Sequence, residues 1–207
     1  EFLEQHPEIP LCHTLVRLMD EASRLGGIRH EGRVPPTGDC FEALLQHCWI
    51  TISSVMIRRE LYDAYGPFTE ALPFGKMGED YEFFLKVAAH HPIGLIGEPL
   101  VRYRKSTSAI THGNWRGTPV AFPFFQALLD RPQIWSARAS PARLRQRVAA
   151  AARENAEFWG HRGRPGRAAW FGLQAVRYAP AAPDAWWSLL RDTARGCRLA
   201  GRAALAL

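Results

Sequence analysis

Apolar positions along the first 110 residues alternate between short runs typical of strands and spacings typical of helices. The runs LCHTLVRLM (11–19) and ITISSVMI (50–57) are short, apolar and bounded, and they predict strands. Helical spacing predicts three helices, over residues 41–48, 58–65 and 79–90. The segment GLIGEPLVRYR (94–104) then returns as extended chain, and this alternation predicts an α/β layer architecture.

Glycine and proline mark where these elements end. Gly66 and Pro67 directly follow the second helix, as expected of a helix stop. The stretch GGIRHEGRVPPTGD (26–39) is rich in turn residues and predicts a loop, and residues 68–76 predict another. Pro99 cannot donate to a β-ladder, so it favours an edge strand or a strand start.

The pattern changes after about residue 112, where strand-like runs disappear. Ser140 and Pro141 form an N-cap and N1 pair that opens a long helix ending near Gly160, and Pro165 and Asp184 open two more. The piece GRAAWFGLQAVRYAPAAPDAWW has the rhythm of one tetratricopeptide-type hairpin, so this part is either a helical cap or a partner-binding repeat. We therefore divide the chain into an α/β part, 1–120, and an all-α extension, 121–207.

Charge separates the same two parts. The net charge is +6, but residues 131–207 carry 14 arginines and 4 acidic residues, whereas residues 1–130 carry 12 basic and 16 acidic residues. The arginine-rich part either meets an anionic partner such as a membrane surface or is a solvated face shaped by a GC-rich genome. No nucleic-acid-reading motif accompanies the charge, so we expect no nucleic-acid partner.

Targeting and redox signals are sparse. The chain opens at Glu1 inside an amphipathic run, without a secretory signal or an apolar stretch near eighteen residues, which predicts a cytoplasmic protein truncated at its N-terminus. Its four cysteines form no CxxC pair and have no zinc-like spacing to histidines, so reduced cysteines are expected.

The stretch GKMGEDYEFFLKV (75–87) sets two acidic residues at a helix start. With Gly78 or Glu79 as the N-cap, Asp80 shares one inward stripe with four later residues, Phe84, Val87, Ala88 and His91. Carboxylates in a first turn are stabilised by the helix dipole by about 0.3–1 kcal/mol without any chemistry. An ionised aspartate at a cleft rim is equally a candidate general base, because it accepts a proton from a hydroxyl group.

An ordered series of motifs surrounds this pair. A segment with small hydroxyl residues is followed by RRE (58–60), a Gly-x-Phe turn (66–68), GED (78–80), an amphipathic helix and EPLVRYR (98–104). This series resembles the second half of a family 2 glycosyltransferase domain of the GT-A fold. The similarity covers about sixty residues, and a weaker one in EFLEQHPEIPLCHT extends it to nearly 110.

The resemblance implies transfer of a sugar from a nucleotide-diphosphate donor to an acceptor hydroxyl with inversion, as in cell-surface polysaccharide synthesis. It implies that Asp80 is the catalytic base, with Glu79 either an acceptor-binding partner or a simple cap. It also implies substrate-binding roles for Ser53, Ser54, Gly78, Arg102, Arg104 and Trp115.

Each of these roles has a structural alternative. Arg102 and Arg104 alternate on one strand face, either toward the cleft of Asp80 or exposed on an edge strand. Ser53 and Ser54 either touch the acceptor or bond to the backbone. Trp115 either stacks on a sugar ring or shields the cleft.

The chain departs from the family pattern in three places. It has no Asp-x-Asp element, so a partial GT-A (Rossmann-like) domain lacking its N-terminal nucleotide-binding half is expected. Pro67, Phe68 and Thr69 stand where relatives often have Gly-Phe-Asp. No histidine directly follows YR, and His112 lies farther on. A divalent metal, Mg or Mn, is thus implied by kinship alone, with no ligand assigned.

Two functions follow from these observations. The first is a glycosyltransferase fragment whose partners are a nucleotide-sugar donor and a saccharide or other hydroxyl acceptor. The second is a helical interaction module, or a non-catalytic relative, whose basic tail docks an anionic membrane or a partner protein. In both, the protein is cytoplasmic, with peripheral contact at the inner membrane face through the basic tail.

Overall fold

The computed structural model describes residues 1–69, 78–107 and 120–204. Of residues 203 and 204 it describes the backbone only. The chain folds into two compact units. The first unit comprises Glu1–Arg116 and Gln133–Arg138, and the second comprises Gly117–Pro132 and Ala139–Leu207. The loop predicted over 68–76 lies mostly outside the described residues.

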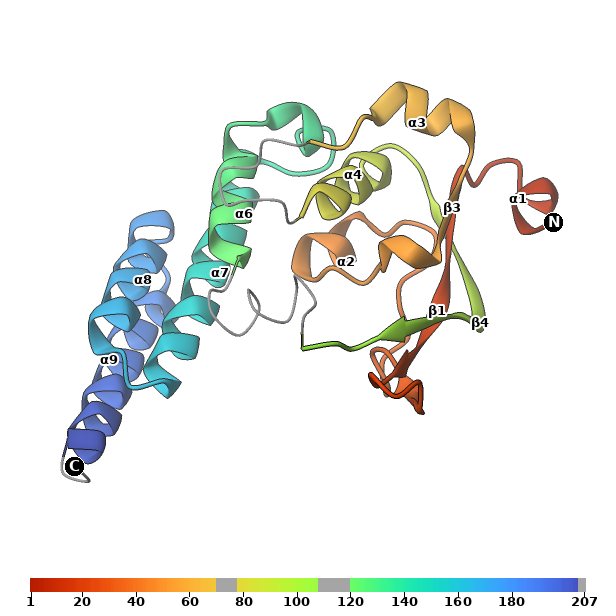
Figure 1. Ribbon diagram of the computed structural model, residues 1–207. Coiled ribbons are helices and arrows are strands. Elements are labelled where there is room, and N and C mark those ends of the chain that lie inside the picture. Colours follow the sequence, from red (N-terminus) through yellow and green to blue (C-terminus); the bar gives the residue numbers. More distant parts are fainter. Residues whose placement is uncertain (70–77, 108–119, 205–207) are drawn as a thin grey trace. The chain divides into compact units, whose positions relative to one another are not determined.

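The first unit has mixed α/β structure (Figure 1). Its elements in chain order are α1 (Phe2–Gln5), β1 (Leu11–Met19), β2 (Leu25–Ile28), α2 (Phe41–Gln46), the 3-10 turn η1 (Ile52–Ser54), β3 (Val55–Ile57), α3 (Arg59–Tyr65), α4 (Glu79–Ala88) and β4 (Ile93–Arg104). A further 3-10 turn, η2 (Pro132–Ile134), follows later in the chain. Alternation of strands and helices is therefore confirmed.

The four strands form one mixed sheet organised around β1. β1 pairs in parallel with β4 from Leu11 to Met19. β3 pairs antiparallel with the start of β1, and β2 pairs antiparallel with its end. The β1–β4 register jumps between Thr14↔Ile96 and Val16↔Val101, so residues 97–100 of β4 bulge out of the ladder. Pro99 lies in this bulge, where its missing N–H costs no ladder hydrogen bond.

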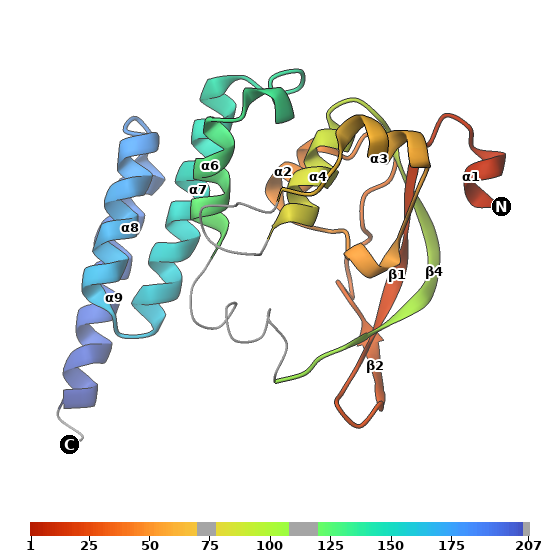
Figure 2. The ribbon, with the colours of Figure 1, turned by 45° about the horizontal axis from the view of Figure 1, so that its top comes forward.

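Two helices pack on one side of this sheet. Figures 1 and 2 show α2 and α4 side by side on the same face of β1 and β4. Phe41 and Leu44 of α2, Phe84 of α4, and Leu11 and Ile93 of the strands are completely buried. These bulky side chains form the core, and burial of apolar area is the main stabilising term.

Two predictions for this unit were wrong in detail. Residues 50–57 do not form one strand, because the backbone N–H of Ser54 donates to the Thr51 carbonyl (2.8 Å) and closes the turn η1 first. The predicted loop 26–39 begins with part of β2. Gly26 and Gly27 within this strand are typical turn residues, and they led to the loop prediction. β2 is short and exposed, so its apolar pattern is weak.

The second unit contains only helices among its described residues. They are α6 (Ala121–Leu129), α7 (Pro141–His161), α8 (Pro165–Tyr178) and α9 (Pro183–Ala204). The last three are long, pack pairwise and form a bundle. The start of α7 is confirmed in detail, since Ser140 Oγ accepts the Arg143 N–H (3.1 Å) and Pro141 is the first helical residue. No helix in the described part of the chain is long and apolar enough to span a bilayer.

Candidate functional site

The N-terminus of α4 carries the predicted catalytic pair. Gly78 is the N-cap and has φ 93°, a left-handed conformation that glycine adopts without strain. Its carbonyl accepts the Glu82 N–H (2.9 Å), which begins the helix. Asp80 is half-buried, and its Oδ1 accepts the N–H of Tyr81 (2.7 Å). The predicted inward stripe is confirmed only in part: Phe84, Val87 and Ala88 are buried, but Asp80 and His91 are half-buried, and Glu82, Phe83 and Leu85 outside the stripe are buried as well.

Burial raises the pKa of the Asp80 carboxyl group above its usual value of 3.8. The neighbouring negative charge of Glu79 acts in the same direction, while the Tyr81 N–H and the positive charge of Arg29 oppose it. Asp80 makes no ion pair with any residue that the structure describes. A carboxylate with a raised pKa is a better proton acceptor than an ordinary surface aspartate.

Glu79 lies beside Asp80 in an unusual state. It is half-buried, and its Oε2 atom is enclosed without a hydrogen-bond partner in the described structure. An enclosed carboxylate oxygen without a donor is costly, and a bound ligand, ion or water is one explanation for such an atom. By contrast, Glu82, three residues farther along α4, bonds to Thr69 Oγ1 (2.7 Å) and Lys86 Nζ (3.0 Å).

Arg29 is a cation near Asp80 that the sequence did not single out. It follows β2, and its positive charge lowers the pKa of both Asp80 and Cys48. Its guanidinium carbon lies 5.6 Å from the ring centroid of Tyr103 in β4. Burial and the charge of Asp80 raise the pKa of the Cys48 thiol to about 12, so Cys48 is not a nucleophile.

Three rings next to Arg29 form what we call the aromatic cluster: His30, His47 and Trp49. Their ring centroids lie 5.1 to 5.2 Å apart. Burial and the nearby Arg29 charge lower the pKa of His30 to about 4, so the ring is neutral at pH 7. His30 Nε2 is enclosed without a partner in the described structure.

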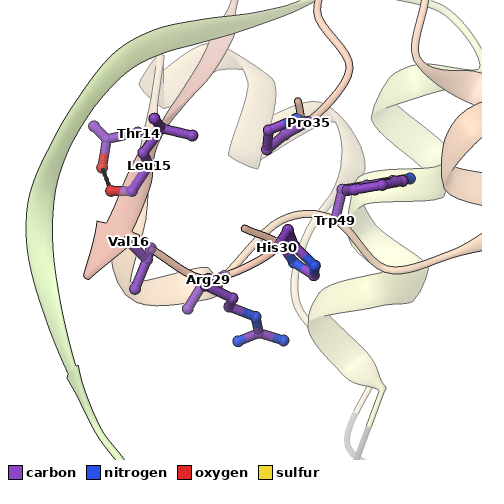
Figure 3. A pocket seen from close by; sticks show the side chains of 8 residues that line it. Thr14, Leu15, Val16, Arg29, His30, Pro35 and Trp49 are labelled. Carbon is purple, nitrogen blue, oxygen red and sulfur yellow. Dashed lines mark hydrogen bonds between the residues drawn. The ribbon is translucent and has the colours of Figure 1, made fainter. Parts of the chain in front are cut away.

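A small cavity adjoins this cluster (Figure 3). It measures about 10 Å³, room for about one water molecule. Eight residues line it, from β1, from the chain after β2 and from the segment before η1: Thr14, Leu15, Val16, Arg29, His30, Pro35, Trp49 and Thr51. A site of this size binds a substrate only at its mouth, not inside.

The structure places Arg102 and Arg104 together, but away from Arg29. Arg102 pairs with Arg17 of β1, whereas Tyr103, the next residue, points to the opposite face and contacts Arg29. Arg104 Nη1 donates to the carbonyls of Asp20 (3.1 Å) and Glu21 (3.0 Å) in the β1–β2 turn. Both arginines are exposed, and alternation along β4 puts them on the strand face opposite to Tyr103 and Arg29, which favours the alternative of exposed arginines on an edge strand.

The remaining predicted residues divide into three cases. Ser54 is buried, and its hydroxyl donates to the Thr51 carbonyl (2.7 Å), the structural alternative considered above. Ser53 is exposed. Trp115 and His112 lie outside the described residues.

The described residues offer no set of ligands for the implied divalent metal. No group of three His, Cys, Asp or Glu side chains in the described segments is arranged to hold an ion.

Comparisons of the chain with protein-family models, with curated proteins and with solved structures found no match.

Sequence reasoning missed Arg29 and the aromatic cluster. Arg29 and His30 come from a predicted loop, whereas His47 and Trp49 lie at the end of a predicted helix, and nothing in their spacing links them to residue 80. The available signals were a positive charge in a turn-rich stretch and a tryptophan between a predicted helix and a predicted strand, but each is common on protein surfaces.

Proposed function

We propose that this chain is the acceptor-side part of an inverting glycosyltransferase of the GT-A type and that Asp80 is its general base. The observation that carries the proposal is the state of Asp80: a half-buried carboxylate at a helix N-terminus, with a raised pKa and no ion pair among the described residues. The order of motifs from Arg58 to Arg104 supports the same assignment.

The chemistry assigned to Asp80 is a single proton transfer. Its Oδ1 accepts the Tyr81 N–H, and no side chain in the described structure donates to the carboxylate. Oδ2 accepts the proton of the acceptor hydroxyl as that oxygen forms a bond to the anomeric carbon of the donor. The bond from this carbon to the diphosphate breaks at the same time, and attack from the opposite side inverts the configuration.

Neighbouring groups adjust the base. Burial and Glu79 raise the pKa of Asp80, whereas the Tyr81 N–H and Arg29 lower it, and the net result is a carboxylate more basic than an ordinary aspartate. Glu79 lies next to the base on the same helix turn and is half-buried, so its carboxylate is the candidate to accept a second hydroxyl of the acceptor. Trp49 lines the same small cavity as Arg29 and offers a ring for contact with a sugar face.

Replacement of Asp80 by Asn tests the proposal. The full-length protein is incubated with nucleotide-diphosphate sugars and candidate saccharide acceptors, and acceptor-dependent release of nucleoside diphosphate is measured. Asp80→Asn keeps the shape and the Tyr81 contact but removes the basic oxygen, so transfer should fall at least about 100-fold. Asp63→Asn, at an exposed carboxylate of α3, is the matched control and should keep full activity. Undiminished turnover of Asp80→Asn would remove the base assignment.

A further inference from the structure

The second unit presents an exposed apolar surface on its last two helices. Two neighbouring contacts show how α8 and α9 pack. A Cβ on Gly172 would lie 2.7 Å from Leu189 Cα, and a Cβ on Gly196 would lie 2.9 Å from Pro165 Cα. Residues earlier in α8 thus meet residues later in α9, so the two helices run antiparallel in direct backbone contact.

Five large apolar side chains on this hairpin have half or more of their surface exposed. We call them the apolar patch: Trp170, Leu173, Trp186, Trp187 and Leu190. The two on α8 lie about 60° apart around the helix and the three on α9 within about 100°, so each set occupies one face. Both sets lie at the level where Gly172 meets Leu189.

The opposite sides of the same helices are buried against α7. On α9, Ala185, Ser188 and Asp192 are buried, and the Asp192 carbonyl lies 2.7 Å from where a Gly160 Cβ would be. On α8, Ala168 and Ala175 are fully buried. The patch is therefore on the side of the hairpin that faces away from α7, and a soluble monomer seldom exposes so many large apolar side chains together.

The unpaired charges of α8 and α9 that flank the patch are positive. The two acidic residues of α8 and α9 are both paired: Asp184 with Arg153 (2.9 Å), and Asp192 with Arg191 (2.8 Å). Arg177 and Arg198 make no ion pair in the part of the chain that the structure describes. Arg177 lies one turn beyond Leu173, and Arg198 two turns beyond Leu190, so free cations flank the apolar surface.

We propose that the apolar patch and its flanking arginines dock this unit on the surface of a bilayer that contains anionic lipids. Tryptophans fit the headgroup region because an apolar ring carries a polar N–H, and leucines enter the acyl boundary. Arg177 and Arg198 then meet lipid phosphates. A symmetric contact with a second copy is less favourable, because it sets these unpaired arginines against one another with no free carboxylate of α8 or α9 to balance them.

Vesicle flotation tests this proposal directly. The purified full chain is mixed with vesicles of phosphatidylcholine alone or of phosphatidylcholine with phosphatidylglycerol, at low and at high salt. We expect flotation with the anionic vesicles, weakened by salt because exposed charges are screened. Trp187→Ser with Leu190→Ser should lower the partition coefficient at least about tenfold. Arg177→Gln and Arg198→Gln should each lower it about fivefold.

The control variants separate docking from general stickiness. Met56→Ser and Leu100→Ser remove equally exposed apolar side chains from the first unit and should leave flotation unchanged. The patch residues are on the surface, so the variants should keep the circular dichroism and melting temperature of the parent. Asp80→Asn should also float normally, so a failure of the catalytic proposal is distinguishable from a failure of this one.

Three results would overturn the proposal. The first is absence of flotation with anionic vesicles, and the second is flotation that the patch substitutions do not alter. The third is a dimer, seen by light scattering without lipid binding, that Trp187→Ser dissociates. That last outcome would assign the patch to a second copy of the chain.

Discussion

Two aspartates, one in each unit, are removed from water in different ways. Asp192 of α9 is completely buried, and three side chains donate to it: Ser188 (2.9 Å), Arg191 (2.9 and 2.8 Å) and Arg195 (3.5 Å). Asp80 of α4 is only half-buried, yet no side chain in the described structure donates to it, and its Oδ1 accepts the neighbouring Tyr81 N–H. The more buried carboxylate is therefore the better satisfied one.

This difference suggests different roles. A buried carboxylate with arginine and hydroxyl donors stabilises one arrangement of helices and has no lone pair left for chemistry. A carboxylate whose burial raises its pKa without a fixed cation retains the capacity to bind a proton or a ligand. Substitutions at and around the two sites test this contrast, first where the expected loss of stability is greatest.

Removal of the Asp192 carboxylate should have the largest effect on stability. Asp192→Ala breaks several charge-assisted hydrogen bonds and leaves Ser188 buried without its partner, so we expect a loss of about 3 kcal/mol in the free energy of unfolding. Urea denaturation followed by circular dichroism measures this loss. Asp184→Ala, at an exposed partner of Arg153, is the matched control and should cost at most about 1 kcal/mol. Equal losses for the two variants would contradict the structural role of Asp192.

The sequence predicted much of the second unit because its signals are local. Ser140, Pro141 and Pro165 specify helix starts through contacts within one turn. The arginines that bind Asp192 lie one and three residues away on the same helix. Its complete burial was not predicted, since that depends on how α7 and α9 approach each other.

The candidate site was predicted only in part because its contacts are not local. The helix start and Asp80 follow from the pattern around Gly78. Side chains alternate along a strand, so the sequence correctly put Arg102 and Arg104 on one face of β4. Pairing with β1 decides which face of the sheet that is. Arg29 comes near Asp80 only through the folded sheet, and no spacing along the chain encodes that approach.

The close approach of α7 and α9 beside Asp192 predicts a second, smaller loss of stability when Gly160 is replaced. A Cβ at Gly160 would lie 2.7 Å from the Asp192 carbonyl oxygen, so Gly160→Ala should force the helices apart at a cost of about 2 kcal/mol. Gly201→Ala is the matched control, because no atom lies within 4 Å of where its Cβ would be and alanine favours a helix. We expect that variant to gain about 0.5–1 kcal/mol in urea denaturation. A loss at Gly201 equal to that at Gly160 would mean that helix spacing is not the cause.

Asp80→Asn should change stability least, and its pH dependence has a definite sign. Because burial raises the pKa of Asp80, the folded protein keeps this proton at pH values where the unfolded chain, with its ordinary value of 3.8, has released it. The contribution of Asp80 to stability is therefore full below that value and is lost as the pH rises through the raised folded pKa. Asparagine cannot titrate and keeps the oxygen that accepts the Tyr81 N–H, while the lost helix-dipole attraction limits the net change to about 1 kcal/mol.

The measurement is the difference in unfolding free energy between Asp80→Asn and the parent protein, followed over acidic to neutral pH. Contributions that both proteins share cancel in this difference. One of them comes from His30, whose pKa is lowered to about 4, so that its contribution to stability increases as the pH rises. The variant should gain on the parent as the pH rises and then reach a plateau. A difference that is constant, or that shrinks as the pH rises, would show that Asp80 is as well satisfied as Asp192, and the contrast between the two aspartates would no longer mark position 80 as the reactive one.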